Sequence, residues 1–158
     1  MTVSVRRYAD ADLDAVAALH KEAFARQGRS RDWIAANARA YPRIRLYVAE
    51  LDGTLRGYIA WTEKSGFRTE AVLELEQIAV AQSHRNRGIG SALIRQSLQD
   101  VAARLGERSA SLKAVMVSTR ADNAAQRLYR KALGAEIAAM LPALYSADEV
   151  IMIARKPL

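Results

Sequence analysis

The residues with the clearest capacity for chemistry form a basic, glycine-containing loop between a strand and a helix. A strand pattern ends at Val80, and a strong helical pattern begins at Gly88. The loop carries Arg85 and Arg87, and Gly90 follows in the first turn of the helix. The first N–H groups of a helix lack an acceptor within the helix and lie at the positive end of its dipole. Glycines leave these groups accessible and arginines add charge, so the loop is predicted to bind a phosphate or pyrophosphate.

Three nucleotide-binding patterns compete for this loop. A P-loop would end in Gly-Lys-Ser or Gly-Lys-Thr, which is missing here. A dinucleotide fingerprint needs a third glycine, where this chain has Leu93, and it should follow an early strand. The acyl-coenzyme A pattern Arg/Gln-x-x-Gly-x-Gly/Ala is satisfied by Arg85, Gly88 and Gly90. A Gly-x-Gly at a helix start is also found as an ordinary cap, which remains the alternative.

A second motif lies downstream, where Asn123 is followed by Leu128-Tyr129 and by Leu133-Gly134. With the loop, it resembles the signatures of the GNAT superfamily of N-acetyltransferases, and the resemblance covers essentially the whole chain. The resemblance implies an α/β fold with a central mixed sheet, splayed between its fourth and fifth strands and covered by helices on both faces. It also implies acetyl-CoA as the cosubstrate and a primary amine as the acceptor.

The resemblance carries the family's cofactor contacts onto this sequence. Backbone groups of Ile78 and Val80 would pair with the pantetheine arm, and the amide of Ala79 or Val80 would polarise the thioester carbonyl. Asn123 would contact the pantetheine, although it is also a good helix N-cap. The residues that would line the pyrophosphate are Arg85, Arg87, Gly88, Ile89, Gly90 and Ser91.

Two residues are candidates for proton transfer. Tyr129 resembles the family's general acid, but it lies one residue early, and Arg130 takes the family position in an ungapped comparison. Glu74 and Glu76 share one face of a central strand, where carboxylates are costly unless they face a cleft. Glu76 is nominated as the general base that accepts the ammonium proton, directly or through water. A salt-bridged or solvent-facing role for Glu76 is the alternative.

The elements that must position these residues follow from hydrophobic periodicity. Strands are predicted at residues 3–8, 45–51, 55–62, 72–80, 114–119, 135–144 and 149–155, and helices near 13–24, 30–41, 88–105 and 123–133. Asp10 or Asp12 is expected to cap the first helix, and Ser30 the second. The order β-α-α-β-β-β-α-β-α-β-β, without a linker or repeat, predicts a single domain over residues 1–158.

Composition narrows the function further. The 158 residues hold 24 Lys and Arg against 17 Asp and Glu, a formal charge of +7, with 51% hydrophobic residues and no cysteine. Thiolate nucleophiles, disulfides and cysteine metal sites are thereby excluded, and the two histidines lack metal-ligand spacing, so no metal site is predicted. The basic residues are scattered, which argues against nucleic-acid binding and leaves a biased composition as an alternative source of charge. With no signal peptide pattern or membrane span, we expect a cytoplasmic protein; a homodimer is left open.

The sequence therefore predicts an N-acetyltransferase in which an amine attacks the thioester of acetyl-CoA directly. The alternative is a non-catalytic module of the same fold that only binds acyl-coenzyme A. The amine is unspecified, a small molecule or the N-terminus or a lysine of a protein. Its predicted pocket residues are Phe24, Arg26, Arg29, Trp33, Tyr58, Trp61, Tyr145 and Asp148, and Arg120, Arg127 and Lys131 are candidates near the adenosine phosphate.

Overall fold

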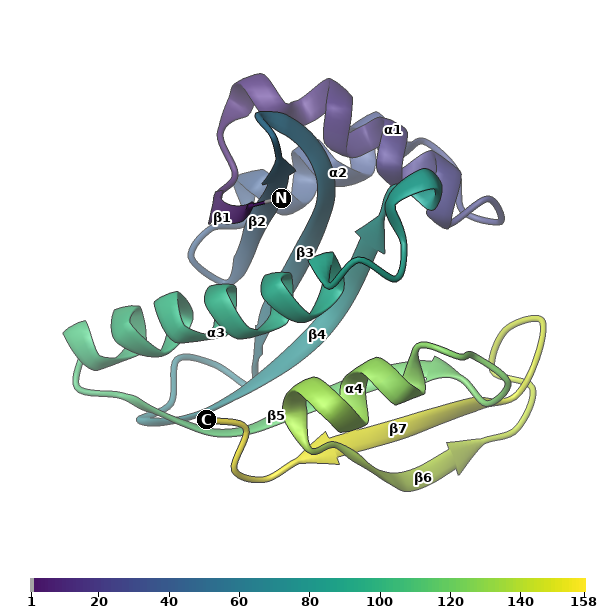
Figure 1. Ribbon diagram of the computed structural model, residues 1–158. Coiled ribbons are helices and arrows are strands. Elements are labelled where there is room, and N and C mark those ends of the chain that lie inside the picture. Colours follow the sequence, from purple (N-terminus) through teal and green to yellow (C-terminus); the bar gives the residue numbers. More distant parts are fainter. Residues whose placement is uncertain (1) are drawn as a thin grey trace. The chain divides into compact units, whose positions relative to one another are not determined.

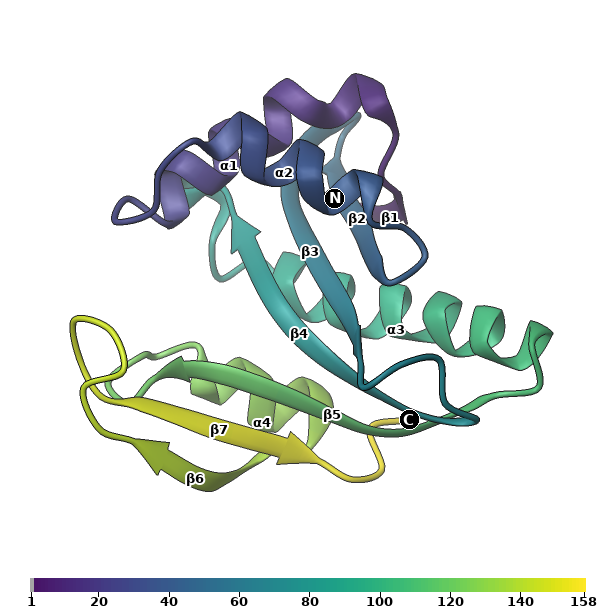
Figure 2. The same cartoon turned by 180° about the vertical axis from the view of Figure 1, so that it is seen from behind.

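The computed structural model describes residues 2–158, and Figures 1 and 2 show its elements from two sides. Within these residues a seven-stranded sheet has the order β1-β2-β3-β4-β5-β7-β6. Its strands are β1 (Val3–Arg7), β2 (Ile44–Leu51), β3 (Thr54–Lys64), β4 (Glu70–Val80), β5 (Ser111–Arg120), β6 (Glu136–Leu141) and β7 (Glu149–Ala154). The helices are α1 (Leu13–Ala23), α2 (Ser30–Arg39), α3 (Ile89–Glu107) and α4 (Gln126–Leu133), with 3-10 turns at Asp10–Asp12 and Gln82–His84. The predicted α/β class and order of elements are confirmed.

The sheet is mixed because β4 and β5 run parallel, whereas β1 with β2, β5 with β7 and β6 with β7 are antiparallel. A parallel pair needs a long crossover, and α3 provides it. The last parallel pair joins Glu74 to Met116. Beyond that pair β4 continues to Val80 and β5 to Arg120. The expected splaying between the fourth and fifth strands stays a prediction.

The chain divides into two compact units, which are described separately. The first unit comprises Met1–Trp61 and Gln77–Leu98, and the second comprises Thr62–Glu76 and Gln99–Leu158. Strands β3 and β4 and helix α3 contribute residues to both. The single domain expected from the sequence stays a prediction.

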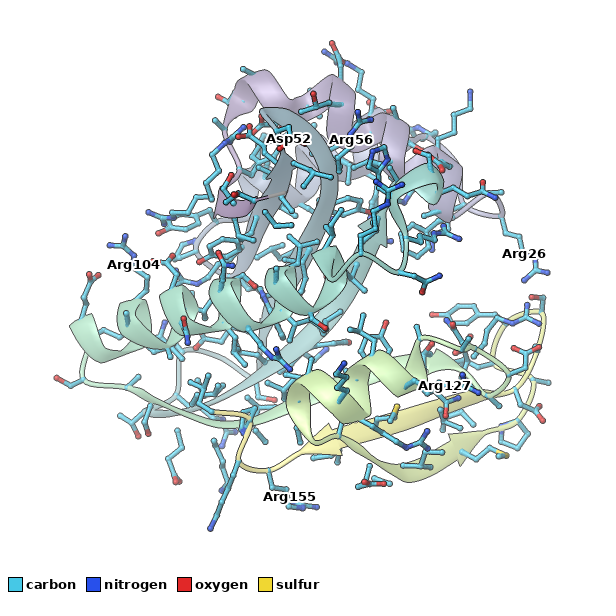
Figure 3. All side chains as sticks on the ribbon, in the orientation of Figure 1. Arg26, Asp52, Arg56, Arg104, Arg127 and Arg155 are labelled. Atoms are coloured by element: carbon cyan, nitrogen blue, oxygen red, sulfur yellow. The ribbon has the colours of Figure 1, made fainter. Side chains whose placement is uncertain are left out.

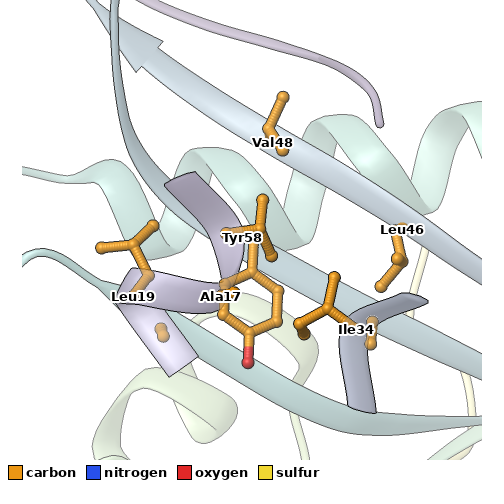
Figure 4. Packing of buried hydrophobic residues seen from close by; sticks show 9 residues of the cluster. Ala17, Leu19, Ile34, Leu46, Val48 and Tyr58 are labelled. Carbon is orange, nitrogen blue, oxygen red and sulfur yellow. The ribbon is translucent and has the colours of Figure 1, made fainter. Parts of the chain in front are cut away.

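The core of the first unit forms where α1 and α2 pack on the strands. The apolar stripe of α1 is buried at Val16, Ala17 and Leu19, and Ile34 of α2 joins it. These side chains meet strand residues that include Tyr58, as Figure 4 shows. The stripe predicted from helical periodicity therefore packs as expected, since residues three or four apart share one helix face.

The predicted helix caps are wrong in their hydrogen bonds. Asp12 stands at the N-cap of α1, but its carboxylate accepts from Arg6 at 2.8 and 2.9 Å and from the Ala9 N–H at 2.8 Å. Arg29, in a left-handed conformation, is the N-cap of α2, and Ser30 is its first helical residue. The Ser30 hydroxyl lies 2.7 Å from Nδ1 of His20. Both side chains form hydrogen bonds with other partners and therefore do not cap the helices.

Helix α3 lies close to β3 in the first unit because residue 57 is glycine. A Cβ at Gly57 would stand 3.0 Å from the Ala79 carbonyl oxygen, 3.0 Å from Leu93 Cδ1 and 3.3 Å from Ile89 Cγ2. Ile89 and Leu93 are buried, and they belong to the first turns of α3. The missing side chain therefore sets how near the start of this helix comes to the strand.

The second unit carries α4 on one face of β5, β7 and β6 (Figures 1 and 2). Strand β7 is largely buried, whereas β6 is exposed along most of its length. Glu63 is 2% exposed and forms two hydrogen bonds with the guanidinium of Arg108. A buried carboxylate requires such a partner.

We predict that Gly57→Ala lowers the free energy of unfolding by about 1–3 kcal/mol, because the new methyl group would overpack the contact between β3 and α3. Gly106→Ala is the matched control, since Gly106 lies inside α3 and a Cβ there meets nothing within 4 Å. That control should gain about 0.5–1 kcal/mol from helix propensity. Urea denaturation measures both, and equal effects would contradict the packing argument.

Candidate active site

The basic loop after β4 ends in the N-terminus of a long helix. Gly88 has a φ of +81°, and its carbonyl accepts the Ala92 N–H at 3.0 Å. Gly88 is therefore the N-cap of α3, and the N–H groups of Ile89, Gly90 and Ser91 precede the first helical hydrogen bond. Converging N–H groups at the positive end of a 19-residue helix suit a phosphate or diphosphate.

Backbone contacts fix the segment that leads into this helix. The Ala81 N–H donates to the Arg56 carbonyl at 2.7 Å, and the Gln82 N–H donates to the Glu22 carboxylate at 2.8 Å. Arg85 Nε donates to the Val80 carbonyl at 3.3 Å. The loop is thus held from α1, from β3 and by its own arginine before any ligand arrives.

The positive charge of the loop comes from its arginines. Arg85 and Arg87 are exposed, as an arginine that contacts a phosphate must be. The pKa of His84 is lowered, first by desolvation and then by the charges of Arg56 and Arg87. The His84 imidazole is therefore neutral at pH 7 and adds no charge.

The end of β4 presents alternate faces to the interior. Ala79 is 5% exposed and belongs to the core under α1 and α2, whereas Ile78 and Val80 are half-buried on the opposite side. The Val80 carbonyl already accepts the Arg85 side chain. The expected pairing of Ile78 and Val80 with pantetheine is not tested by these contacts and stays a prediction.

Glu76 and Glu74 differ in their partners, although both are half-buried on one face of β4. Glu74 lies 3.9 Å from the Lys64 ammonium. Glu76 accepts a hydrogen bond of 2.5 Å from the Thr62 hydroxyl and has no cationic partner among residues 2–158. Glu76 is therefore the carboxylate of the two that is not engaged with a protein cation among these residues, as suits a base for an ammonium substrate.

Gln77 organises a buried network that sequence reasoning missed. Its Oε1 accepts from Trp33 Nε1 at 3.1 Å and from the Tyr58 hydroxyl at 3.0 Å. Its Nε2 donates to Gln27 Oε1 at 3.0 Å, and that oxygen also accepts from His20 Nε2 at 2.9 Å. The α1–α2 loop is thereby tied to β4 at the residue after Glu76. The sequence signal for this network was Gln77 itself, an amide side chain on the core-facing side of an apolar strand.

The residues of the predicted acceptor pocket differ in exposure, and the pocket itself stays a prediction. Tyr58 and Trp61 are 0% exposed, and Trp61 Nε1 donates to Ser97 of α3 at 2.8 Å, so both are core residues. Trp33 and Tyr145 are 40% and 73% exposed and are free to contact a substrate. Arg26, Arg29 and Asp148 are exposed, and Phe24 is half-buried. Residues 57–63 of β3 are all buried, so both aromatics are interior although they lie on opposite faces of the strand.

Asn123 does not cap a helix, so that alternative is wrong. Helix α4 begins at Gln126 with Ala125 at its N-cap, three residues later than predicted. Asn123 instead closes the preceding turn, where its Oδ1 accepts from the Ala125 N–H and its Nδ2 donates to Thr119 Oγ1, both at 2.9 Å. Side-chain bonds to nearby backbone compete with helix formation in this way.

Tyr129 lies on the inner face of α4 together with Gln126 and Leu133, while Arg130 is exposed. Tyr129 is 5% exposed, and burial raises its pKa to about 12. The phenol is therefore fully protonated at pH 7 and able to donate, as a general acid must be. In the ungapped comparison Arg130 takes the position of the family's tyrosine. The structure places Arg130 on the exposed face of α4 and Tyr129 on the buried face.

Comparison with known proteins decides the family. Residues 13–135 match the sequence model of the acetyltransferase (GNAT) family. The chain belongs to this family. It is therefore an acyltransferase, and the fold and the two motifs agree with GNAT membership.

Individual relatives agree with GNAT membership along nearly the whole chain. An uncharacterized N-acetyltransferase of Methanocaldococcus jannaschii is 28% identical over 155 residues, which cover 97% of this chain and 92% of the relative. Ard1 of Thermoplasma volcanium superposes with a TM-score of 0.77 at 23% identity, covering 97% of each chain. Arabidopsis thaliana NAA60 in complex with acetyl-CoA gives a TM-score of 0.74 at 18% identity, covering 96% of this chain and 97% of NAA60. The two structures support the GNAT fold.

In residues 2–158 no group of three or more acidic or histidine side chains could hold a metal ion. Over the same residues, no helix is long and apolar enough to cross a membrane.

We predict that the raised pKa of Tyr129 makes stability depend on pH in the alkaline range. Below about pH 10 the phenol is protonated in both states, and between about 10 and 12 the unfolded chain ionises first, which favours unfolding. From pH 9 to pH 11 the wild type should therefore lose about 1 kcal/mol of unfolding free energy more than Tyr129→Phe. Urea denaturation at both pH values tests this, and an equal loss in the two proteins would contradict the burial of Tyr129.

Proposed function

We propose that this GNAT-family chain transfers the acetyl group of acetyl-CoA to a primary amine. The amine nitrogen forms a bond to the thioester carbonyl carbon as the carbon–sulfur bond breaks. Two protons leave the nitrogen, one to a base before the attack and one as the amide forms, and the thiolate takes up one, so an ammonium substrate releases one proton overall. The observation that carries the proposal is the N-terminus of α3, which Gly88 and the two loop arginines prepare for a diphosphate. The acetyl-CoA complex of NAA60 supports the choice of cosubstrate.

The loop is assigned to the diphosphate of coenzyme A. Amides of Ile89, Gly90 and Ser91 would donate to its oxygens, and Arg85 and Arg87 would neutralise its charge. Ile78, Ala79 and Val80 are assigned to the pantetheine arm and the thioester carbonyl. Asn123 is assigned to the pantetheine as well, although both ends of its side-chain amide already have protein partners.

Glu76 is assigned as the general base. The substrate ammonium has a pKa of about 8–10, so a group must remove its proton before the nitrogen can attack. Glu76 offers a carboxylate oxygen whose neighbour is the neutral Thr62 hydroxyl, whereas Glu74 has Lys64 close by. Thr62 acts on Glu76 and is therefore a positioning residue.

Tyr129 is assigned as the general acid for the departing thiolate. Its raised pKa keeps the proton on the phenol until a stronger base forms beside it. The deep burial of Tyr129 and the solvent exposure of Arg130 favour a second function, a GNAT domain that binds acyl-coenzyme A without turnover. Release of free thiol with a panel of primary amines, followed by mass spectrometry of the amines, distinguishes the two.

The acceptor is proposed as a primary amine, of a small molecule or of a protein N-terminus or lysine. The basic residues are scattered along the sequence, and the labelled arginines in Figure 3 belong to different segments, whereas nucleic-acid binding typically uses a stripe or cluster. The adenosine phosphate is assigned to Arg120, Arg127 and Lys131, of which Arg120 is already paired with Asp122 at 3.0 Å. A cytoplasmic location and a homodimer stay predictions.

We predict that Gly88→Ala weakens acetyl-CoA binding because an L-residue at φ +81° costs about 1–2 kcal/mol or moves the amides. Affinity should fall by roughly tenfold. Gly53→Ala is the matched control, since Gly53 has a φ of +77° in the β2–β3 turn and an equally open surrounding. Calorimetry measures both dissociation constants. If the control weakens binding as much as Gly88→Ala, the effect is general strain and the loop assignment fails.

We predict that Glu76→Gln lowers kcat by about a hundredfold or more, with acetyl-CoA affinity unchanged, since general-base catalysis contributes about this much. Glu74→Gln is the control on the same strand face and should keep most activity. Thr62→Val should move the acidic limb of the kcat–pH profile, which a merely structural role would leave in place. Full activity of Glu76→Gln at every pH would remove Glu76 from the mechanism.

A further inference from the structure

A cavity lies in the first unit, and none of the residues assigned to acetyl-CoA lines it. Its volume is about 320 Å³, and its nine lining residues come from β1 and the segment after it, the end of α2, the α2–β2 connection and the first half of β2. Figure 2 shows β1, α2 and β2 side by side. We call it the Arg45 cavity after its central cation. Small-molecule sites are typically about 300–1,000 Å³, so it is large enough for a compact ligand.

Arg45 is buried, and two of its nitrogens have no hydrogen-bond partner among the described residues. Its side chain lines the cavity and is 5% exposed, and its Nε and Nη1 atoms are buried with no hydrogen-bond acceptor in residues 2–158. A guanidinium cannot lose its proton in a protein, so the charge cannot be avoided by titration. A buried cation is costly unless an anion or several acceptors compensate it.

Other arginines of the chain have carboxylate partners, although Arg56 Nε and Arg104 Nε are also buried without a hydrogen-bond partner in residues 2–158. Arg108, also partly buried, binds the carboxylate of Glu63. Arg6 binds Asp12, and Arg104 lies 3.7 Å from Asp100 and 3.1 Å from Glu107. The fold thus supplies a carboxylate to these arginines, and it supplies none to Arg45 within the part of the chain that the structure describes.

A second cation stands at the same cavity. The guanidinium carbons of Arg7 and Arg45 lie 5.2 and 5.3 Å from the centroid of the Tyr41 ring, and Arg7 Nη2 donates to the Tyr41 hydroxyl at 2.5 Å. The ring face attracts both cations, but it leaves their mutual repulsion uncompensated. Asp10 also lines the cavity, yet it forms no ion pair with either arginine among the described residues. The lining therefore has an excess of positive charge.

We propose that the Arg45 cavity binds a small oxyanion, a carboxylate or a phosphate, whose oxygens accept from Arg45 and Arg7. Planar guanidinium donors match the geometry of both groups. The remaining walls include Ala38, Ile44 and Leu46 and the ring of Tyr41, which suit a compact apolar body attached to the anion. The site is separate from the diphosphate loop, so its ligand binds whether or not acetyl-CoA is bound.

Calorimetry on the full chain tests the proposal. Coenzyme A is kept saturating so that the loop after β4 is occupied, and inorganic phosphate, citrate and benzoate are titrated against a sodium chloride reference of equal ionic strength. We expect at least one probe to bind. Binding of phosphate alone identifies a phosphate ligand, binding of citrate or benzoate alone a carboxylate, and binding of both kinds a general oxyanion site.

Arg45→Met replaces the cation with an unbranched apolar side chain. The affinity for the probe should fall by at least about tenfold. Arg43→Met is the matched control, because Arg43 is exposed, lies two residues away and does not line the cavity. It should leave the affinity unchanged. Should Arg45→Met fail to fold, Arg7→Gln decides, since Arg7 is exposed and its replacement disturbs no core. The proposal is overturned if no probe binds beyond the chloride reference, or if the folded variant binds as the wild type does.

Discussion

The close approach between α3 and β3 at Gly57 is the constraint on which the cofactor loop depends. Without a side chain at residue 57, Ile89 and Leu93 reach the strand close to the main-chain oxygen of Ala79. The connection from Val80 to Ile89 turns back through residues 81–88, and Gly88 ends it in a left-handed conformation. The packing at Gly57 therefore sets where the N–H groups that begin the helix lie.

Alternation along β4 separates the chemical and structural roles of adjacent residues. Glu74 and Glu76 stand on the half-buried face, while Gln77 is buried and bonded to Tyr58. The proposed proton acceptor is thus next in sequence to Gln77, which binds Gln27 of the α1–α2 loop and Trp33 of α2. In this account the strand fixes both the base and the loop from which substrate contacts are expected to come.

Local patterns were enough to predict the order of elements, the loop at Gly88 and the GNAT resemblance, because periodicity and glycine placement are properties of neighbouring residues. Features that depend on distant partners were not predictable. The Ser30 hydroxyl contacts His20 and does not cap the helix, and the partners of Gln77 lie about twenty to fifty residues away in the sequence. The missing carboxylate partner of Arg45 could not be predicted for the same reason, since only the folded chain shows which arginines lack one.

The central claim is that main-chain amides at the start of α3 hold the diphosphate of coenzyme A. Amide chemical shifts of the ¹⁵N-labelled chain, recorded with acetyl-CoA and with pantetheine, test it most directly. The account predicts that acetyl-CoA moves the signals of Ile89, Gly90 and Ser91 strongly and that pantetheine, which lacks the diphosphate, leaves them nearly in place. Unchanged signals with saturating acetyl-CoA, or equal shifts with both ligands, would contradict it.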